Sequence, residues 1–434
     1  MKYPVKNQPF SFITDNSQEC DKNCAFVLTE QNGKYLSQVK NNGEVKILSP
    51  KKVQDIYSIK NIKVIGITGT NGKTTTAAAI YSILLDLGLL AAFQGSRGFF
   101  LNDKKIEKKT HTTPAILTTL YHMYLARESG CEYFIMEVSS HAIVQRRIES
   151  LDFALKVFTN ITHDHLDYHK SFQEYWRVKS SFFSDETTKL INKDAKKIDF
   201  NIKNAYTYAL DAPASFNIVA YSLNKGINAV IKHFDIQEEF FSPLYGYFNI
   251  YNILAAISSV KLVSNFTLKN ICKVVENFAG VGGRMEVVSS RPLVIVDFAH
   301  TPDGMQKVLD SLKEKKISIV FGAGGNRDKS KRVMMGRVAS RYGNKIYLTS
   351  DNPRDECPMG IIKDIKKGIS KDKKLKIIPD RKEAIQIAVN ELLDDDVLII
   401  LGKGDEEYIE IGKQKIPFDD RMVVRVAMKE KFNR

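Results

Sequence analysis

A glycine-rich segment between an apolar run and a helix-like stretch carries the clearest chemistry in this sequence. Residues 66–76 read GITGTNGKTTT, within and after the β-branched run that starts at Ile62. Backbone N–H groups of such a turn, together with the positive end of the following helix, can cradle phosphate oxygens. We therefore expect Lys73 to reach the β- and γ-phosphates of a nucleotide and the Thr74 hydroxyl to bind Mg²⁺. The strict phosphate-loop pattern has glycine where this chain has Ile67, so a flexible, threonine-rich turn is the alternative interpretation.

Two further polar clusters could bind a metal ion. Glu137 lies at the end of the apolar run YFIMEV, where a lone buried carboxylate is costly and a metal ion is one natural partner. A capping or salt-bridged glutamate is the alternative. Residues 163–169 read HDHLDYH, in which His163, His165 and Asp167 begin an HxHxDH hydrolytic pattern, but the last histidine is one residue late. We favour a magnesium site that uses one histidine, because a phosphate loop lies upstream, over a hydrolytic site or a solvated loop.

The elements that position these clusters follow one repeated pattern: a β-branched run, a polar or glycine-rich segment and a helix-like stretch. The β-branched runs lie at residues 62–68, 133–138, 155–159, 293–296, 317–321, 345–349 and 397–401. Alternating strands and helices build parallel sheets, whose ligands bind beyond the carboxyl ends of the strands. The sequence therefore predicts an α/β fold with its unusual polar residues gathered at one edge of each sheet.

Length and local composition divide the chain into three predicted domains. A chain of 434 residues is too long for one ordinary core. Residues 1–60 are polar and lack the repeated pattern, which indicates a small N-terminal domain. Residues 61–287 are expected to form a central P-loop ATPase domain with a mainly parallel sheet. Residues 288–434 are expected to form a C-terminal Rossmann-like domain, because the glycine-rich segment GVGGRMEV ends at residue 287.

Bulk composition restricts the environment and the partners. The net charge of +14 indicates either a lysine-rich solvated surface or attraction for anions. We expect no nucleic acid partner, because no helix-turn-helix, zinc-finger or RNA-binding aromatic motif occurs. We also expect no membrane span, since the longest apolar stretch, residues 77–93, is interrupted by Asp86. The N-terminus lacks the apolar core of a signal peptide, and five scattered cysteines predict reduced thiols in a cytoplasmic protein.

Eight motifs occur in the order found in Mur ligases, from about residue 62 to the C-terminus. They read GTNGKTT, MEVSSHAIVQRRI, TNITHDHLDYH with EYWRVK, GRME, VDFAHTPDG, GAGGNRDK, SDNPR and GKGDEE. The chain resembles this family, and its SDNPR resembles the motif of the members that add diaminopimelate rather than lysine. The resemblance implies an ATP-dependent ligase of peptidoglycan synthesis that adds meso-diaminopimelate to UDP-N-acetylmuramoyl-L-alanyl-D-glutamate (UDP-MurNAc-L-Ala-D-Glu) through an acyl phosphate.

Two other functions compete with this interpretation. A folylpolyglutamate synthetase-like ligase would share the ATP-binding core, but SDNPR, VSSHAIVQRRI and the separate N-terminal segment disfavour it. A basic, nucleic-acid-binding P-loop ATPase is the rival from another class, and stimulation of ATP turnover by DNA or RNA would support it. We expect a monomer.

The resemblance also implies roles for individual residues. It implies ATP binding by Gly69, Thr70, Asn71, Gly72, Lys73, Thr74, Thr75, Asn249, Arg284 and Asp297. It implies two Mg²⁺ sites, the first formed by Thr74 and Glu137 and the second by His165 and a carbamylated Lys179. Lys73, His165 and Lys179 would be the catalytic residues. The UDP-muramoyl peptide would be bound by Ser17 of a UDP-binding N-terminal domain and by Thr112, Thr113, Ser139, Gln145 and Arg147.

The implied diaminopimelate pocket is chemically coherent. It consists of Arg327, Asp351, Asn352, Pro353, Arg354, Gly402 and Glu406. Diaminopimelate carries two carboxylates and two amines, so planar guanidinium groups can pair with the carboxylates and acidic side chains with the ammonium groups. A type I turn capped by aspartate is the plainer interpretation of DNPR. The family usually has histidine where this chain has Asp405.

Overall fold

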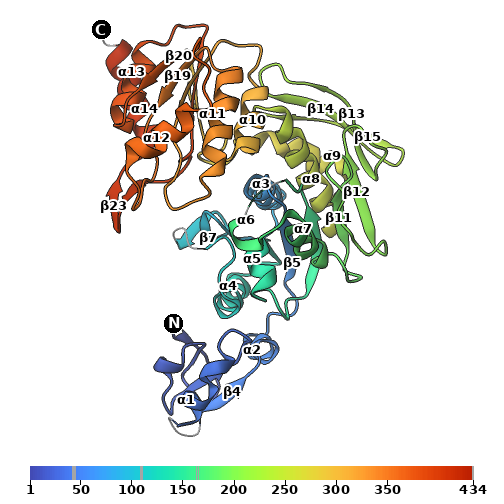
Figure 1. The fold of residues 1–434 in the computed structure, drawn as a ribbon. Coiled ribbons are helices and arrows are strands. Elements are labelled where there is room, and N and C mark those ends of the chain that lie inside the picture. Colours follow the sequence, from blue (N-terminus) through green and yellow to red (C-terminus); the bar gives the residue numbers. More distant parts are fainter. Residues whose placement is uncertain (42–44, 108–110, 163, 165, 433–434) are drawn as a thin grey trace.

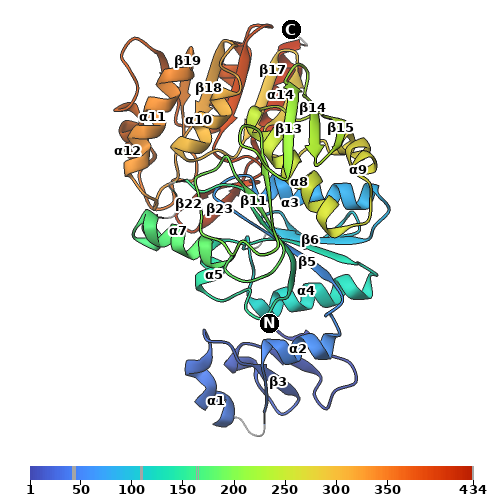
Figure 2. The same ribbon diagram turned by 90° about the vertical axis from the view of Figure 1, so that its right-hand side faces the viewer.

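Three large sheets and one two-stranded hairpin organise the part of the chain that the structure describes. The computed structural model describes residues 1–41, 45–107, 111–162, 164 and 166–432. Figure 1 shows the N-terminal sheet beneath the large central sheet and the C-terminal sheet above it, and Figure 2 shows the same order after a quarter turn. The α/β class and the mainly parallel central sheet predicted from the sequence are confirmed. No helix in the described ranges is long and apolar enough to cross a membrane.

The N-terminal part is a four-stranded sheet in the order β1-β2-β3-β4. Its strands are β1 (Tyr3–Pro4), β2 (Phe12–Thr14), β3 (Cys24–Val27) and β4 (Lys46–Leu48), with helices α1 (Leu36–Asn41) and α2 (Pro50–Tyr57). Two pairs of tyrosine rings join it to the central part. The rings of Tyr57 and Tyr124 are stacked with centroids 4.6 Å apart, and those of Tyr3 and Tyr121 are tilted with centroids 4.7 Å apart. Both partners belong to α4 (Ile116–Glu128).

The central sheet has eleven strands in the order β15-β14-β13-β12-β11-β10-β5-β9-β6-β7-β8. Its middle is parallel and consists of β13-β12-β11-β10-β5-β9-β6. Antiparallel strands extend both edges, with β14 and β15 beside β13 and β7 and β8 beside β6. The bounds are β5 (Lys63–Thr68), β6 (Ala91–Gly95), β7 (Gly98–Leu101), β8 (Lys104–Glu107), β9 (Tyr133–Glu137), β10 (Phe153–Phe158), β11 (Lys189–Asn192), β12 (Ala205–Ala209), β13 (Phe216–Ser222), β14 (Ile227–His233) and β15 (Ile236–Ser242).

Helices cover both faces of the central sheet. Helix α3 (Lys73–Asp86) is apolar on nearly all sides, as expected for a helix enclosed between a sheet and another helix. It packs on α8 (Tyr247–Val263) in one buried cluster, and α4 packs against the opposite face in a second cluster. The remaining helices are α5 (Ser140–Val144), α6 (Leu166–His169), α7 (Phe172–Ser181) and α9 (Leu268–Val274).

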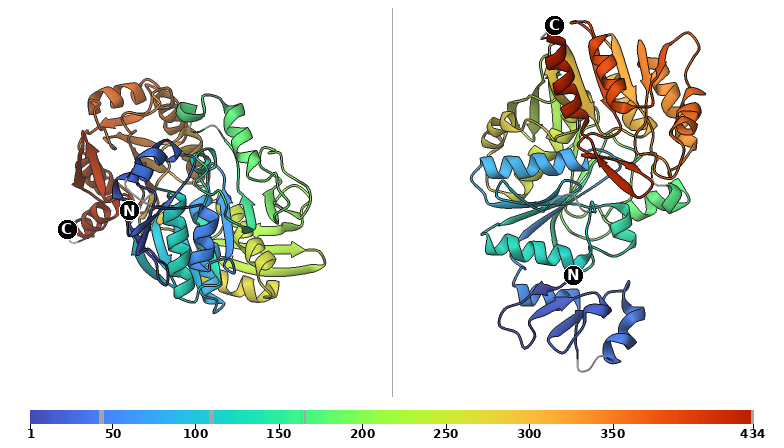
Figure 3. Two further views of the ribbon diagram at one scale, coloured as in Figure 1. Left: turned by 90° about the horizontal axis from the view of Figure 1, so that it is seen from below. Right: turned by 90° about the vertical axis from the view of Figure 1, so that its left-hand side faces the viewer.

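The C-terminal sheet has six strands in the order β16-β17-β21-β18-β19-β20, parallel except for the edge strand β16. Its strands are β16 (Glu286–Ser290), β17 (Leu293–Asp297), β18 (Ile317–Phe321), β19 (Lys345–Leu348), β20 (Lys374–Ile377) and β21 (Val397–Leu401). Its helices are α10 (Pro302–Asp310), α11 (Ser330–Tyr342), α12 (Pro358–Lys366), α13 (Arg381–Asn390) and α14 (Asp420–Phe432). A hairpin of β22 (Tyr408–Ile411) and β23 (Gln414–Pro417) projects from this body toward the central sheet (Figure 3). Residues 286 and 287, predicted from the sequence to belong to the central domain, lie in β16.

Candidate active site

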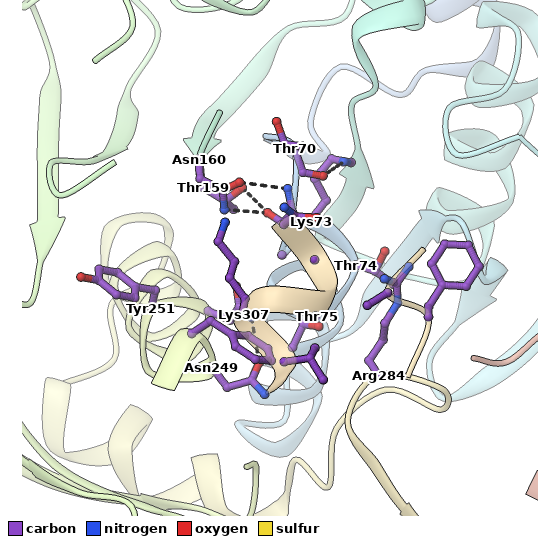
Figure 4. Close-up of a pocket in the computed structure, with 18 of the residues that line it drawn as sticks. Thr70, Lys73, Thr74, Thr75, Thr159, Asn160, Asn249, Tyr251, Arg284 and Lys307 are labelled. Atoms are coloured by element: carbon purple, nitrogen blue, oxygen red, sulfur yellow. Dashed lines mark hydrogen bonds between the residues drawn. The ribbon is translucent and has the colours of Figure 1, made fainter. Parts of the chain in front are cut away.

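The loop between β5 and α3 is gripped by the segment that follows β10. The Asn71 N–H donates to Oδ1 of Asn160 at 3.0 Å, and the Asn71 carbonyl accepts from Nδ2 of Asn160 at 3.0 Å and the Thr159 hydroxyl at 2.6 Å (Figure 4). Gly69 has φ +154°, and a Cβ there would lie 1.9 Å from the Thr159 hydroxyl oxygen. Only glycine therefore fits at this position, and the loop backbone is fixed before any ligand binds.

Lys73 begins α3, and its side chain folds back onto this loop. Its Nζ donates to the carbonyl oxygens of Gly69 at 2.8 Å and Thr70 at 3.0 Å. Burial lowers the pKa of Lys73, against which the nearby carboxylates of Glu137 and Asp164 raise it. A cation at a helix N-terminus beside glycine-rich backbone is suited to contact phosphate oxygens.

Glu137 ends β9 and is completely buried beside the loop. Its carboxylate accepts from the Thr74 hydroxyl at 2.9 Å, the Ser96 N–H at 2.8 Å and the Ser96 hydroxyl at 3.2 Å. Gly95 makes room for it, since a Cβ there would lie 2.2 Å from Oε1 of Glu137. A buried carboxylate and a hydroxyl held together in this way form a set of oxygen ligands suited to Mg²⁺.

Lys179 on α7 is buried, and its amine contacts the same Gly69 carbonyl as Lys73. Its Nζ donates to the Thr68 hydroxyl at 3.2 Å and to the Gly69 carbonyl at 3.0 Å. Burial holds the pKa of Lys179 well below its ordinary value, and the charge of Lys73 lowers it further. The amine is therefore more readily neutral, and hence nucleophilic, than a solvated lysine amine. His165, the residue predicted to act beside Lys179, lies outside the described residues, as does His163.

A cavity of about 490 Å³ opens above the loop between the central and C-terminal parts. Its lining comes mainly from the loop after β5, from α8, from the segments after β10 and β11, and from the end of β17 with the residues that follow it. From the predicted ATP-binding set it includes Thr70, Asn71, Gly72, Lys73, Thr74, Thr75, Asn249, Arg284 and Asp297. Thr112 and Glu137 also reach this cavity. Its volume lies within the range of small-molecule sites.

Two asparagines of α8 line the cavity, and one of them lies against the phosphate loop. Nδ2 of Asn252 donates to Oδ1 of Asn249 at 2.8 Å, and Asn249 donates to the Tyr245 carbonyl at 2.7 Å. Gly72 has φ +85°, and a Cβ there would lie 2.4 Å from Oδ1 of Asn252. The loop and α8 therefore approach each other as closely as a glycine permits.

Arg284 and Asp297 form the wall contributed by the C-terminal part. The Arg284 guanidinium lies 4.3 Å from the ring centroid of Phe298, a cation–π contact that orients it along the cavity. Asp297 accepts from the backbone N–H groups of Met285 and Ala299, both at 2.7 Å. Burial raises the pKa of Asp297, and the charge of Arg284 opposes that shift.

The residues predicted to bind the UDP-muramoyl peptide form a connected network at the start of α5. The Thr113 hydroxyl donates to the Glu137 carbonyl at 2.9 Å and accepts from the Ser139 N–H at 3.0 Å. Arg147 donates to the Thr113 carbonyl at 2.8 Å and pairs with Gln145. Thr112 shares a hydrogen bond of 3.0 Å with Ser96, which connects this network to the Glu137 site.

Ser17 lies apart from that network, in the N-terminal sheet. It is buried, and its hydroxyl donates to Gln38 at 3.2 Å. The same part of the chain reaches the network through Gln31, whose side chain donates to the Gln145 carbonyl at 2.7 Å. Ser17 and Gln31 follow β2 and β3, which are parallel, so both lie on the edge of this sheet that faces α5.

A second polar cluster lies at the carboxyl ends of β19 and β21. Asn352 donates to Glu406 at 2.8 Å and accepts from the buried Nζ of Lys403 at 3.0 Å. Gly402 allows this approach, since a Cβ there would lie 2.3 Å from Oδ2 of Asp351. Five of the residues predicted to bind diaminopimelate belong to this cluster: Asp351, Asn352, Pro353, Gly402 and Glu406.

Arg354 closes the cluster against the hairpin. Its Nε donates to Glu410 at 2.8 Å and its Nη1 to the Gly325 carbonyl at 2.8 Å. A Cβ at Gly324 would lie 3.1 Å from Nη1 of Arg354 and 3.8 Å from Cγ of Arg327, so the two arginines flank one glycine turn. Arg327 is exposed, whereas Arg354 is half-buried.

Several residues at these two sites were not singled out from the sequence. They are Ser96, Asn160, Asp164, Asn252 and Lys307 at the cavity and Lys403 and Glu410 at the second cluster. Asn160 and Asp164 lie in the motif TNITHDH and Lys403 in GKGDEE, so those motifs contained a signal. Ser96 follows a strand in the segment GSRG. Asn252, Lys307 and Glu410 carry no local signal, because only the packing of distant segments brings them to the sites.

Comparisons with family models and with known proteins all give the same family. The family model described as the Mur ligase middle domain matches residues 67–260, and the Mur ligase, glutamate ligase domain matches residues 283–404. The chain is 52% identical to a UDP-N-acetylmuramoyl-L-alanyl-D-glutamate--2,6-diaminopimelate ligase of Wolinella succinogenes, over 99% of each chain. It is 50% identical to the protein of that name from Helicobacter pylori, over 97% of this chain and 96% of that one.

Solved structures give the same result for the fold. A structure of a UDP-N-acetylmuramoyl-L-alanyl-D-glutamate--2,6-diaminopimelate ligase matches with a TM-score of 0.70 and 28% identity, over 98% of this chain and 96% of that one. A folylpolyglutamate synthase of Mycobacterium tuberculosis complexed with ADP and AMPPCP matches with a TM-score of 0.67, over 89% and 95% of the two chains. Its identity of 15% indicates a shared fold.

Proposed function

The chain belongs to the Mur ligase family, and from that premise we propose that it joins meso-diaminopimelate to UDP-MurNAc-L-Ala-D-Glu at the expense of ATP. The observation that carries this proposal is identity of 52% along 99% of both chains with a ligase of that name. The same relationship disfavours the two rival functions, a folylpolyglutamate synthetase and a nucleic-acid-dependent ATPase. The chemistry belongs to peptidoglycan synthesis.

The cavity above the β5–α3 loop would hold ATP. Backbone N–H groups of residues 69–75 and the ammonium of Lys73 would contact the phosphates, while Asn249, Arg284 and Asp297 would contact the rest of the nucleotide. The γ-carboxylate of the D-glutamyl residue attacks the γ-phosphorus, ADP leaves and an acyl phosphate forms. The diaminopimelate amine then attacks the acyl carbon, and phosphate leaves as the amide forms.

Thr74 and Glu137 would hold a first Mg²⁺ ion. Their oxygens are 2.9 Å apart, and the hydrogen-bond donors around the buried Glu137 carboxylate are neutral hydroxyl and amide groups. This donor set fits a hard divalent cation. When bound, Mg²⁺ neutralises charge on the phosphoryl oxygens. Glu137 itself orients the Thr74 hydroxyl, and Ser96 fixes the carboxylate.

Lys179 and His165 would serve a second Mg²⁺ ion, with Lys179 converted to a carbamate. Carbamylation joins the neutral amine to CO₂ and releases a proton, so it is favoured by the lowered pKa of Lys179. A carbamate presents two anionic oxygens where an ammonium would repel the metal. The Lys179 amine lies 3.0 Å from the Gly69 carbonyl, which supports a role for this residue beside the phosphate loop.

The two remaining substrates would approach from opposite sides. The UDP-muramoyl dipeptide would lie between Ser17 of the N-terminal sheet and the network of Thr112, Thr113, Ser139, Gln145 and Arg147. Diaminopimelate would occupy the cluster at the ends of β19 and β21, with Arg327 and Arg354 facing carboxylates and Asp351 and Glu406 facing ammonium groups. Asn352, Pro353 and Gly402 would shape that pocket.

This arrangement favours three functional domains, with boundaries near residues 60 and 287, that act as one monomer. A cytoplasmic location would follow from the nucleotide substrates.

A ligase assay with matched acceptors tests the proposed function. Purified enzyme, ATP, Mg²⁺ and UDP-MurNAc-L-Ala-D-Glu are incubated with meso-diaminopimelate or with L-lysine, and amide product and ADP are quantified. We expect product with meso-diaminopimelate at a rate far above that with L-lysine. A parallel reaction with a folate and L-glutamate tests the rival ligase. Preference for either alternative acceptor would overturn the assignment.

A further inference from the structure

One carboxylate oxygen of Asp303 joins three segments of the chain. Asp303 lies in the first turn of α10 in the C-terminal part. Its Oδ2 accepts from Nδ2 of Asn71 at 3.0 Å and from the Thr162 hydroxyl at 3.2 Å, and it lies 2.9 Å from Nζ of Lys307. Asn71 and Thr162 belong to the central part. The hydrogen bonds to this oxygen therefore join the central and the C-terminal parts, the two bodies that enclose the cavity.

Both partners of Asp303 in the central part lie in loops that line the cavity. Asn71 is in the phosphate loop, where Asn160 already holds its backbone N–H and carbonyl from one side. Asp303 holds the Asn71 side chain from the other side. Thr162 lies two residues before Asp164, a carboxylate that lines the cavity and acts electrostatically on Lys73 and Lys179. The position of the C-terminal body is therefore transmitted to the phosphate loop through Asp303.

We propose that Asp303 is a positioning residue that locks the C-terminal body onto the phosphate loop while the amine attacks the acyl phosphate. The proposal rests on the function proposed above, in which the amine binds on the C-terminal body and the acyl group on the central body. Ligation then requires the two bodies to be held in register. Binding of nucleotide at the loop and docking of the C-terminal body become linked, because each favours the same arrangement of Asn71.

The lock predicts a specific failure when it is removed. With the C-terminal body loosely held, the acyl phosphate waits longer for the amine and is exposed to water. Water attacks the acyl carbon, the bond from that carbon to the phosphate oxygen breaks, and carboxylate, phosphate and protons are released. ATP is then consumed without amide, so the ratio of ADP to amide rises above one.

The test compares Asp303→Ala with Asp310→Ala in the complete reaction. Asp310 is a matched control, because it is an exposed carboxylate on the same helix that pairs with Tyr342 within the C-terminal body. We expect Asp303→Ala to lower the rate of amide formation about fivefold, equivalent to about 1 kcal/mol at tenfold per 1.4 kcal/mol, and to raise the ADP-to-amide ratio. Asp310→Ala should keep a ratio of one. Asp303→Asn, which retains an oxygen acceptor for Asn71 and Thr162, should recover most of the coupling.

A structural role alone gives a different pattern. Asp303 also stabilises the N-terminus of α10, and loss of that effect would lower the melting temperature and both rates together, with the ratio still at one. That outcome, or identical behaviour of the Asp303→Ala and Asp310→Ala variants, would overturn the lock.

A double-mutant cycle tests the lock without the amino-acid acceptor. Asn71→Ala, Asp303→Ala and the double variant are compared in the binding of a non-hydrolysable ATP analogue. We expect the two substitutions to be non-additive, because each removes the same hydrogen bond. Additive effects refute the lock even if wild-type enzyme forms amide with meso-diaminopimelate. Wild-type enzyme that forms no such amide refutes the proposed substrate, while a non-additive cycle would still support the lock.

Discussion

The Thr74 hydroxyl donates to Oε2 of Glu137 at 2.9 Å, a contact between the first turn of α3 and the end of β9. Thr74 follows β5 by way of the phosphate loop, and Glu137 is the last residue of β9. A hydroxyl and a buried carboxylate in contact beside a phosphate loop would supply two oxygen ligands to the Mg²⁺ ion proposed above. The relationship makes Glu137 the residue by which the metal assignment can be tested.

Glu137→Gln should weaken Mg²⁺ binding while preserving the shape of the site. The amide still accepts from Thr74 but carries no charge, so we expect the Mg²⁺ concentration for half-maximal ligation to rise at least about tenfold. Titration of ligase activity with MgCl₂ measures this shift. Glu132→Gln, an exposed change just before the same strand, is the control and should leave the titration unchanged. An unaltered titration in Glu137→Gln would show that the metal binds elsewhere.

The sequence was sufficient to predict which strand ends carry the cavity. Glu137 and Asp297 end their strands and Lys73 begins the helix after β5, and parallel strands bring such residues to one edge of their sheet. The rule that polar residues gather at the carboxyl ends of parallel strands applies within one sheet. It therefore predicted the residues that the central sheet and the C-terminal sheet each bring to the cavity. The spacing of the glycines also predicted the loop. Gly69 is needed there because a side chain at this position would collide with Thr159.

Contacts between the sheets could not be predicted in the same way. Asp303 and Asn71 are 232 positions apart, and nothing in the local pattern of either segment specifies the other. The Glu410–Arg354 pair depends on the hairpin folding back onto the DNPR turn. Asn252 lies on a helix that is apolar on nearly all sides, where its amide is hidden within a hydrophobic pattern. Such residues become visible only when the domains are packed.

Gly72→Ala should destabilise the protein more than Gly88→Ala. Both glycines have positive φ, +85° and +80°, so both substitutions incur a left-handed backbone cost of about 1–2 kcal/mol. At Gly72 the new Cβ also meets Oδ1 of Asn252 at 2.4 Å, whereas at Gly88 it meets open space. Urea denaturation of the two variants measures the difference, which we expect to favour Gly88→Ala. Equal free energies of unfolding would show that the loop and α8 can separate at little cost.

Lys179→Ala should abolish ligation and be partly rescued by acetate. A small carboxylate can occupy the position vacated by a carbamate, whereas it cannot replace an ammonium. Lys73→Ala is the control and should also be inactive. Acetate should not restore its activity, because the group that this substitution removes is positively charged. Unmodified Lys179 by intact-mass analysis of active enzyme would count against the carbamate.

The lowered pKa of Lys179 also gives the pH dependence a sign. In the protein without the carbamate, at pH values between the folded and the ordinary pKa, the Lys179 amine is neutral in the folded chain and protonated in the unfolded chain. The unfolded state then binds more protons, so this group makes the protein less stable as pH falls through that window. Lys179→Met should remove this contribution. The melting temperature should therefore change less with pH for the variant than for the wild type.

Arg354→Ala should impair the use of diaminopimelate far more than that of ATP. If the guanidinium pairs with a substrate carboxylate, its removal costs roughly 2–5 kcal/mol, which is about thirtyfold to several thousandfold in apparent affinity. The structure adds that Arg354 is held by Glu410 at 2.8 Å and by the Gly325 carbonyl. Glu410→Gln removes the charged partner but keeps the arginine, so we expect a smaller rise in the KM for diaminopimelate.

Three KM values and a melting temperature for each variant separate substrate binding from support of the turn. Arg354 has φ +50° and its backbone bridges to Ile411, so a purely structural role is a concrete alternative. In that case the melting temperature falls, and the KM values for ATP, the UDP substrate and diaminopimelate change together. Arg341→Ala, an exposed arginine of the same body, is the matched control and should change none of them. A stable Arg354→Ala variant with an unchanged KM for diaminopimelate would place the amino-acid pocket elsewhere, because a desolvated charge pair cannot be lost without a measurable change in affinity.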